Sequence, residues 1–179
     1  MPSRSFAKAT SLVVSLVTLL LSVAGAIGLL SFDGVGILPG GPLWCRLVHP
    51  FVHAGVLHAL LNVYVFLQLV FFFPVRLRHL LLAYVVSCSC PEMLALWSPS
   101  LLHGLFLHGS CVAGLSGVVF FLLGLVTVHV ARPLRFCMVL LGWQLFGMTL
   151  GTMAVGMHLY CYVIGVLAGC QDSCLRPSA

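Results

Sequence analysis

The stretch HPFVHAGVLHALLN, residues 49–62, places three histidines and an asparagine at the start of a segment that is otherwise suited to hydrocarbon. Polar and ionisable groups inside a bilayer are costly, and where they occur they tend to be functional. His58 and Asn62 are four residues apart, so a helix would bring both to one face. His49 and His53 have the same spacing but lie in or near the preceding loop, where hydrogen bonds that fix the loop are the simpler expectation.

The composition around this stretch indicates a membrane protein. The chain has 179 residues, of which 61% are hydrophobic and 6% are charged, whereas about a quarter of the residues in a soluble domain are charged. The net charge of +5 is scattered between apolar runs and forms no dense basic patch, so nucleic acid is not an expected partner. The expected surrounding is the lipid bilayer.

Six apolar runs have about the length that crosses a bilayer as a helix, roughly 20 residues. They predict an all-α membrane protein whose six transmembrane helices cover 10–32, 54–73, 78–97, 113–131, 133–152 and 157–173. Residues 10–173 then form one domain, with cytoplasmic tails at 1–9 and 174–179, and Pro91 predicts a kink in the third helix. The first run follows Arg4 and Lys8 as a signal peptide would, but its length and the later runs favour a retained helix.

The basic residues predict the orientation of these helices. With the N-terminus inside, only Arg46 lies outside, and the cytoplasmic side carries Arg4, Lys8, Arg76, Arg78, Arg132, Arg135 and Arg176. This bias predicts that both termini are cytoplasmic. The second, fourth and sixth helices then all start just below the outer surface, so one layer is expected to hold His58, Asn62, Ser116 and His158.

The motif GLSG, residues 114–117, supplies a candidate nucleophile. Ser116 would lie near a helix N-terminus, where free N–H groups favour developing negative charge, and its hydroxyl needs a base to become a good nucleophile. His158 lies at the matching depth and can act as general base and then as general acid. Taken singly, GLSG also fits helix packing, and His158 also fits an interfacial histidine wetted by outer water.

Small residues predict how the fourth and sixth helices meet. The sixth run has Gly165 and Gly169 one turn apart, with Cys161 on much the same side, and the fourth has Gly117 and Gly124. Such faces allow close packing in membranes. Close packing would bring His158 within hydrogen-bonding distance of Ser116.

An acyl transfer also needs donors aimed at the oxygen that becomes negative. The Asn62 amide, the His58 ring N–H and the Ser116 backbone N–H are the candidates. A third catalytic member is harder to find, because the only acids are Asp33, Glu92 and Asp172. Glu92 is conceivable as an orienting group, but a Ser–His dyad is the simpler hypothesis.

These residues, in this order, resemble the rhomboid family of intramembrane serine proteases. The family pattern has a Trp-Arg pair in the first loop, a histidine-rich run ending in HxxxN, GxSG on the fourth helix and a histidine on the sixth. This chain has Trp44 and Arg46, then His49, His53, His58 and Asn62, then GLSGVVFFLLG at 114–124, FGM at 146–148, and His158 with Gly165 and Gly169. GxSG alone is a weak signal, whereas the ordered set over residues 44–170 is specific.

The resemblance implies a six-helix fold and a Ser–His protease that opens to the outer side and needs no cofactor or metal. Ser116 would be the nucleophile and His158 the base, with His58 and Asn62 at the oxyanion. Trp44 and Arg46 would belong to a structural first loop, and the fifth helix would border the entrance for single-span membrane protein substrates. Family analogy also suggests a bacterial inner membrane.

The chain departs from the family pattern at three positions. Cys45 separates Trp44 from Arg46, Cys161 stands where the family usually has glycine, and Phe120 stands where a tyrosine often packs on the histidine. None of these changes removes a catalytic group.

Two other functions remain open. One is a catalytically inactive rhomboid-like protein that binds membrane clients, although such relatives usually lack the serine or the histidine. The other is a metal transporter or membrane metalloprotease using His49, His53, His58 and His108, which the lack of an HExxH motif disfavours. The sequence leaves undecided the substrate, its cleavage site, the pathway, the oligomeric state and the pairing of Cys45 with Cys111.

Overall fold

The six apolar runs each contribute one main helix. The computed structural model describes residues 2–100, 104–108, 111–149 and 154–172. The longer helices of this part are α1 (Pro2–Ala26), α3 (Val56–Phe72), α4 (Leu77–Cys88), α6 (Ser116–Thr127), α7 (Pro133–Thr149) and α8 (Val155–Gln171). The short elements are α2 (Leu43–Val48), a 3₁₀ turn η1 (His49–Phe51), α5 (Glu92–Ala95), β1 (Trp97–Ser100) and β2 (Gly104–His108). The chain is thus predominantly helical, as predicted.

The first helix differs from its predicted limits at both ends. α1 begins at Pro2, so most of the expected tail 1–9 is helical, and it ends at Ala26 instead of continuing to residue 32. Glycine explains the early end, because Gly28 has φ 75°, a conformation that glycine adopts without strain. The segment Arg4–Ala26 is the one described helix long and apolar enough by itself to cross a membrane.

The predicted third and fourth spans are too long. α4 and α6 have 12 residues each, or about 18 Å at 1.5 Å per residue, which is short of a hydrocarbon core of roughly 30 Å. The helices Leu43–Phe51 and Val56–Phe72 are long and apolar enough only when taken together, and they meet at a bend of 79°. They form a second candidate span if one crossing can contain that bend. Within the described residues, helix length therefore supports one membrane span, or two, and leaves the six-span bundle a proposal.

The end of the predicted third span is not a kinked helix. α4 ends at Cys88, and after Pro91 the chain forms only the single turn α5. Proline lacks an N–H and disfavours helical geometry in the residue before it, so the helix stops where a kink had been expected. The chain then enters β1, which pairs antiparallel with β2, a hairpin that the all-helical prediction did not include.

α6 forms the centre of the molecule. All its residues from Ser116 to Thr127 are buried, and its neighbours include α8, α4 and α3. Leu115, Phe121, Leu122 and Leu125 are each no more than 1% exposed. A 12-residue helix surrounded by other helices does not itself have to meet lipid along its length.

The peripheral helices expose apolar side chains instead. On α1 these include Leu12, Val13, Leu16 and Leu20, and on α7 they include Leu134, Met138, Val139 and Trp143. The polar side chains Ser11, Ser15, Thr18 and Ser22 of α1 are turned inward and buried. A surface helix of a soluble protein turns its polar side chains to water and its apolar side chains to the core. The reverse arrangement on α1 fits an apolar environment around the protein.

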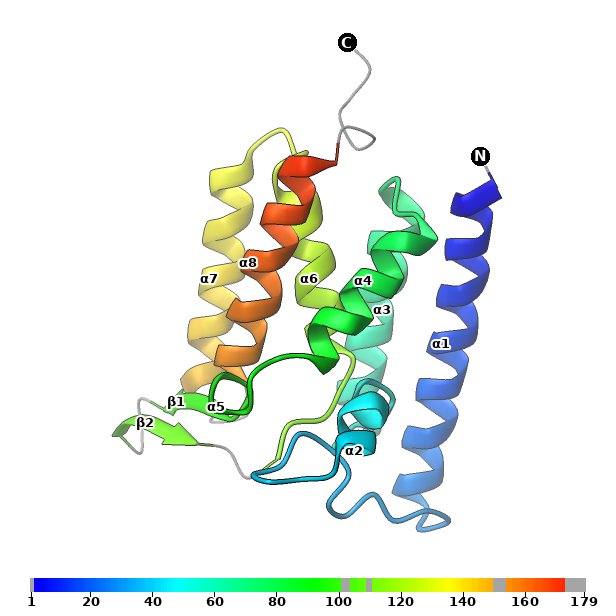
Figure 1. The fold of residues 1–179 in the computed structure, drawn as a ribbon, viewed down its shortest axis with the longest axis vertical. Helices are drawn as coiled ribbons and strands as arrows, with labels where there is room; N and C mark the ends of the chain where they lie inside the picture. Colours follow the sequence, from blue (N-terminus) through cyan, green and yellow to red (C-terminus); the bar gives the residue numbers. More distant parts are fainter. Residues whose placement is uncertain (1, 101–103, 109–110, 150–153, 173–179) are drawn as a thin grey trace.

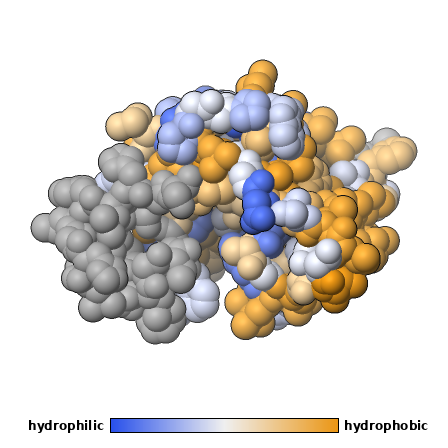
Figure 2. Space-filling view, turned by 90° about the horizontal axis from the view of Figure 1, so that it is seen from below, coloured by the Kyte–Doolittle hydropathy of each residue, from blue (hydrophilic) through white to orange (hydrophobic). Residues whose placement is uncertain are grey.

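The two ends of the molecule differ. α1 starts at the end where α8 finishes, whereas α2, α5 and the hairpin lie at the opposite end (Figure 1). Seen from that opposite end, hydrophilic residues gather around the middle of the face, beside a hollow, and hydrophobic residues cover much of the right-hand rim (Figure 2). The first turns of α3, α6 and α8, which carry His58, Ser116 and His158, lie toward this end (Figure 1).

Candidate active site

Ser116 and His158 lie in contact. The Ser116 Oγ and the His158 Nε2 are 3.0 Å apart, and the two residues are 8% and 6% exposed. Ser116 is the first residue of α6 and His158 the fourth of α8. A hydroxyl and an imidazole at this distance form the nucleophile–base arrangement of serine hydrolases.

The His158 ring is also held by an aromatic face. Phe120, one turn after Ser116, stacks on the imidazole with ring centroids 4.1 Å apart and an interplanar angle of 10°. The Phe120 ring therefore holds the His158 imidazole, and phenylalanine supplies this ring without the tyrosine hydroxyl.

Glycines bring α6 and α8 close enough for this contact. A Cβ at Gly124 would collide with the Tyr162 carbonyl, and one at Gly165 with the Phe121 carbonyl. Gly169 faces Leu125 in the same way, and Cys161 is fully buried. The close approach expected from the small residues is present, and it sets the separation of Ser116 and His158.

Glycines also shape the approach to Ser116. Gly114 has φ 131°, which a residue with a side chain rarely adopts. At Gly117 a Cβ would meet the Ser87 Oγ and the Met157 methyl group. In the GLSG motif, the first glycine thus allows the turn before α6, and the second allows the close contact with Ser87 and Met157.

His58 and Asn62 both lie on α3, and His58 reaches this turn. The His58 Cε1 would lie 3.4 Å from a Cβ at Gly114. The Asn62 amide nitrogen instead donates to the carbonyl of His58, at 3.0 Å. Its side chain is thus engaged with its own helix, and an oxyanion role would require it to turn.

His49 and His53 fix the loop before Ser116, as predicted. The His53 Nε2 accepts a hydrogen bond from the Leu115 N–H at 3.0 Å. The His49 carbonyl accepts one from the Gly114 N–H at 2.8 Å. The His49 ring links the Arg46 carbonyl, at 2.6 Å from Nδ1, with the Ser87 Oγ, at 3.2 Å from Nε2. These contacts join α2, η1 and α4 to the start of α6.

Arg46 and Glu92 form a second tether at this end of the molecule. Arg46 donates to the Cys90 carbonyl at 2.8 Å and lies 3.6 Å from a Glu92 oxygen. The other Glu92 oxygen accepts from the Gly40 N–H at 3.1 Å. Glu92 therefore anchors the first loop, and Trp44 stands 55% exposed on α2.

Gln144 is a site residue that the sequence analysis missed. It lies on α7, is 6% exposed, and its amide nitrogen is 3.1 Å from the His158 Nδ1. The signal was its position as an amide within the apolar run MVLLGWQLFGM.

The remaining candidates lie elsewhere. Asp33 bonds to Ser31 beyond α1, and Asp172 lies 2.7 Å from Arg78 and 2.6 Å from His79 at the far end of α8. Cys45 and Cys111 are free thiols, near the Gly34 and Val35 carbonyls. The motif FGM at 146–148 is within α7, but its side chains are outside the described residues, as is the tail 174–179.

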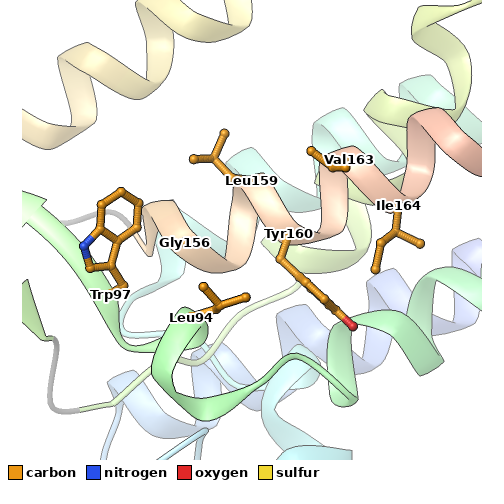
Figure 3. Close-up of a pocket in the computed structure, with 7 residues that line it drawn as sticks. All are labelled: Leu94, Trp97, Gly156, Leu159, Tyr160, Val163 and Ile164. Atoms are coloured by element: carbon orange, nitrogen blue, oxygen red, sulfur yellow. The ribbon is translucent and has the colours of Figure 1, made fainter.

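No metal cluster marks the described part of the chain, and the pocket on α8 lies apart from Ser116 and His158. Within it, no group of three histidine, cysteine or acidic residues could hold a metal ion. A shallow apolar pocket of about 290 Å³ lies on another face of α8, lined by Leu94, Trp97, Gly156, Leu159, Tyr160, Val163 and Ile164 (Figure 3). Its lining includes neither Ser116 nor His158, so it adds nothing to their chemistry.

Comparison with known proteins adds no neighbour: no protein-family model, curated protein or solved structure matches this chain.

Proposed function

We propose that the protein is an intramembrane serine endopeptidase of rhomboid type that cleaves transmembrane segments of single-span membrane proteins. The observation that carries this proposal is the buried contact of 3.0 Å between the Ser116 Oγ and the His158 Nε2, formed by residues from α6 and α8. The two residues come from the motifs on which the resemblance rests. The proposal includes six membrane crossings, with both termini cytoplasmic and the site near the outer surface.

The mechanism follows from the pair. His158 takes the proton of Ser116 as the oxygen attacks a peptide carbonyl of the substrate, and the resulting imidazolium gives that proton to the leaving amine. The acyl-enzyme is then hydrolysed by water that His158 activates in the same way. Phe120, stacked on the ring, keeps the imidazole facing Ser116.

The oxyanion would form at the N-terminus of α6. The first N–H groups of a helix have no intrahelical partner and point toward negative charge, and Ser116 is the first residue of this helix. His58 lies beside Gly114 and can add a ring N–H. Asn62 can add its amide after it releases the His58 carbonyl.

The substrate class follows from the surroundings of the site. The exposed side chains of α7 are largely apolar, so a hydrophobic substrate helix can approach from the bilayer. Cleavage is expected near the outer end of that helix, where it unwinds most easily, and after a small residue.

The test is cleavage of a tagged single-span substrate in proteoliposomes. Ser116→Ala and His158→Ala should each lower the rate at least about a thousand-fold, because nucleophile and base act as a unit. The exposed Ser5 of α1 provides the control, since Ser5→Ala makes the same chemical change far from the site. Undiminished cleavage by either site variant rules out the mechanism, and capture of substrate without cleavage by the wild type supports the client-binding alternative.

A further inference from the structure

Both ring nitrogens of His158 have partners. Nε2 faces the Ser116 hydroxyl at 3.0 Å. Nδ1 faces the Gln144 side chain, with the amide nitrogen at 3.1 Å and the amide oxygen at 3.4 Å. Gln144 comes from α7, so the imidazole bridges a side chain of α6 to one of α7.

A neutral imidazole carries one proton, and its position decides what His158 can do. To take the Ser116 proton, Nε2 must be free, so Nδ1 must carry the hydrogen and needs an acceptor. In serine proteases, replacing the aspartate that accepts this hydrogen by asparagine leaves the histidine in the wrong tautomer. Such variants lose most of their rate. The oxygen of Gln144 can accept from Nδ1, whereas its nitrogen can only donate to it.

No carboxylate of the chain occupies this place. The chain has three acids; Asp33 bonds to Ser31, Glu92 to Gly40 and Arg46, and Asp172 to His79 and Arg78. Among the described residues, the groups that contact the His158 ring include Ser116 and Phe120 of α6 and Gln144 of α7. The titratable group that acts on its charge is His58 of α3. Gln144 is the polar side chain at the position where a catalytic triad has its acid.

We propose that Gln144 is a positioning residue: its amide oxygen accepts the Nδ1 hydrogen of His158 and thereby selects the tautomer in which Nε2 can accept the Ser116 proton. This inference rests on the proposed function. The amide nitrogen is the nearer atom in the structure, and a half-turn about the terminal torsion exchanges it with the oxygen at the same sites. The turned amide corresponds to the reactive form, and the same oxygen stabilises the imidazolium that follows.

The first experiment is steady-state cleavage by Gln144→Met and Gln144→Glu. Methionine keeps the length and apolar volume but has no strong acceptor, so kcat should fall about 10-fold, as for one lost neutral hydrogen bond, while KM changes little. Glutamate keeps the acceptor and adds a charge that favours the imidazolium. This variant should retain kcat at high pH, with the acid limb of its pH profile moved to higher pH. Gln68→Met on α3, a half-buried glutamine, provides the matched control.

The second experiment reads the tautomer without relying on activity. Ring-nitrogen NMR of the full chain in detergent, with the His158 signal assigned from His158→Ala, should show the hydrogen on Nδ1 in the wild type and a mixture in Gln144→Met. Wild-type protein with the hydrogen on Nε2, or an unchanged kcat in Gln144→Met, overturns the inference. A wild type that does not cleave but has the expected tautomer refutes the proposed function and leaves the Gln144 contact standing.

Discussion

Three side chains of the described residues hold the His158 ring, and each constrains it differently. Ser116 lies at one ring nitrogen, Gln144 at the other, and Phe120 covers one face. The contact of Ser116 with His158 was predicted from their matching depth and from the ordered set of motifs, because each residue taken singly also fits helix packing or an interfacial position. Gln144 was not predicted, because nothing in its own helix shows that the side chain turns toward α8.

The Phe120 ring gives the first prediction. Phe120→Leu removes the stacking partner of the imidazole and should lower kcat by about 2- to 10-fold, since an aromatic pair contributes roughly 0.5–1.5 kcal/mol beyond its buried area. Phe120→Tyr keeps the ring and should retain activity. The exposed Phe72 supplies the control, Phe72→Leu. Equal rates for Phe120→Leu and the wild type in the proteoliposome assay would show that the stack does not orient the base.

Glu92 gives a second prediction at this scale. Its carboxylate contacts Gly40 and Arg46 and none of the residues that touch His158. Glu92→Gln keeps an oxygen for the Gly40 N–H and should therefore cleave within about 2-fold of the wild-type rate, because exposed ion pairs contribute little. A loss of kcat as large as that of His158→Ala would instead assign Glu92 to the catalytic group.

At the scale of elements, the contact between α6 and α8 sets the geometry of the site. The spacing of glycines predicted which faces meet, because only small residues let two backbones approach this closely. The lengths of the helices were less predictable. Hydropathy continues past Cys88 and past Thr127, so an apolar run does not reveal where a turn ends the helix. The hairpin β1–β2 lies almost wholly between the predicted third and fourth spans, where hydropathy gave no sign of a strand.

A methyl group added at the contact between α6 and α8 should lower the free energy of unfolding. Gly165→Ala and Gly124→Ala place a Cβ against a backbone carbonyl, which should cost about 1–3 kcal/mol of unfolding free energy by overpacking. Gly142→Ala on α7 is the matched control, because nothing lies within 4 Å of the added Cβ. Thermal unfolding in detergent measures the difference. A midpoint for Gly165→Ala at or above that of Gly142→Ala would contradict the packing.

At the scale of the whole molecule, the arrangement of the two ends agrees with the charge bias. The start of α1 and the end of α8 lie at one end, and the α2 region lies at the other (Figure 1). Composition predicted an apolar molecule, and the basic residues predict that the end with the start of α1 is the cytoplasmic one. Six crossings cannot be derived from helix length alone, since α4 and α6 are short and α6 is wholly buried. Whether α4 and α6 cross the membrane depends on the helices that pack around them, and a single sequence does not reveal that packing.

Exposed cysteines test the orientation. Cys111 is exposed beside the predicted outer loop, so a membrane-impermeant maleimide should label it in intact cells, and Cys111→Ser should remove that label. In a Cys111→Ser, Cys170→Ser background, Ser5→Cys at the start of α1 should add a label only after permeabilisation. The opposite pattern, with Ser5→Cys labelled in intact cells and Cys111 protected, would invert the orientation and move the site to the inner side.

The central claim is that a hydroxyl of α6 and an imidazole of α8 make one reactive pair. Labelling with a serine-reactive fluorophosphonate tests it without a known substrate. The full chain in detergent should be labelled at Ser116, and both Ser116→Ala and His158→Ala should abolish the signal while Ser5→Ala retains it. Equal labelling of the wild type and Ser116→Ala, or a Ser116 signal that survives His158→Ala, would contradict the account.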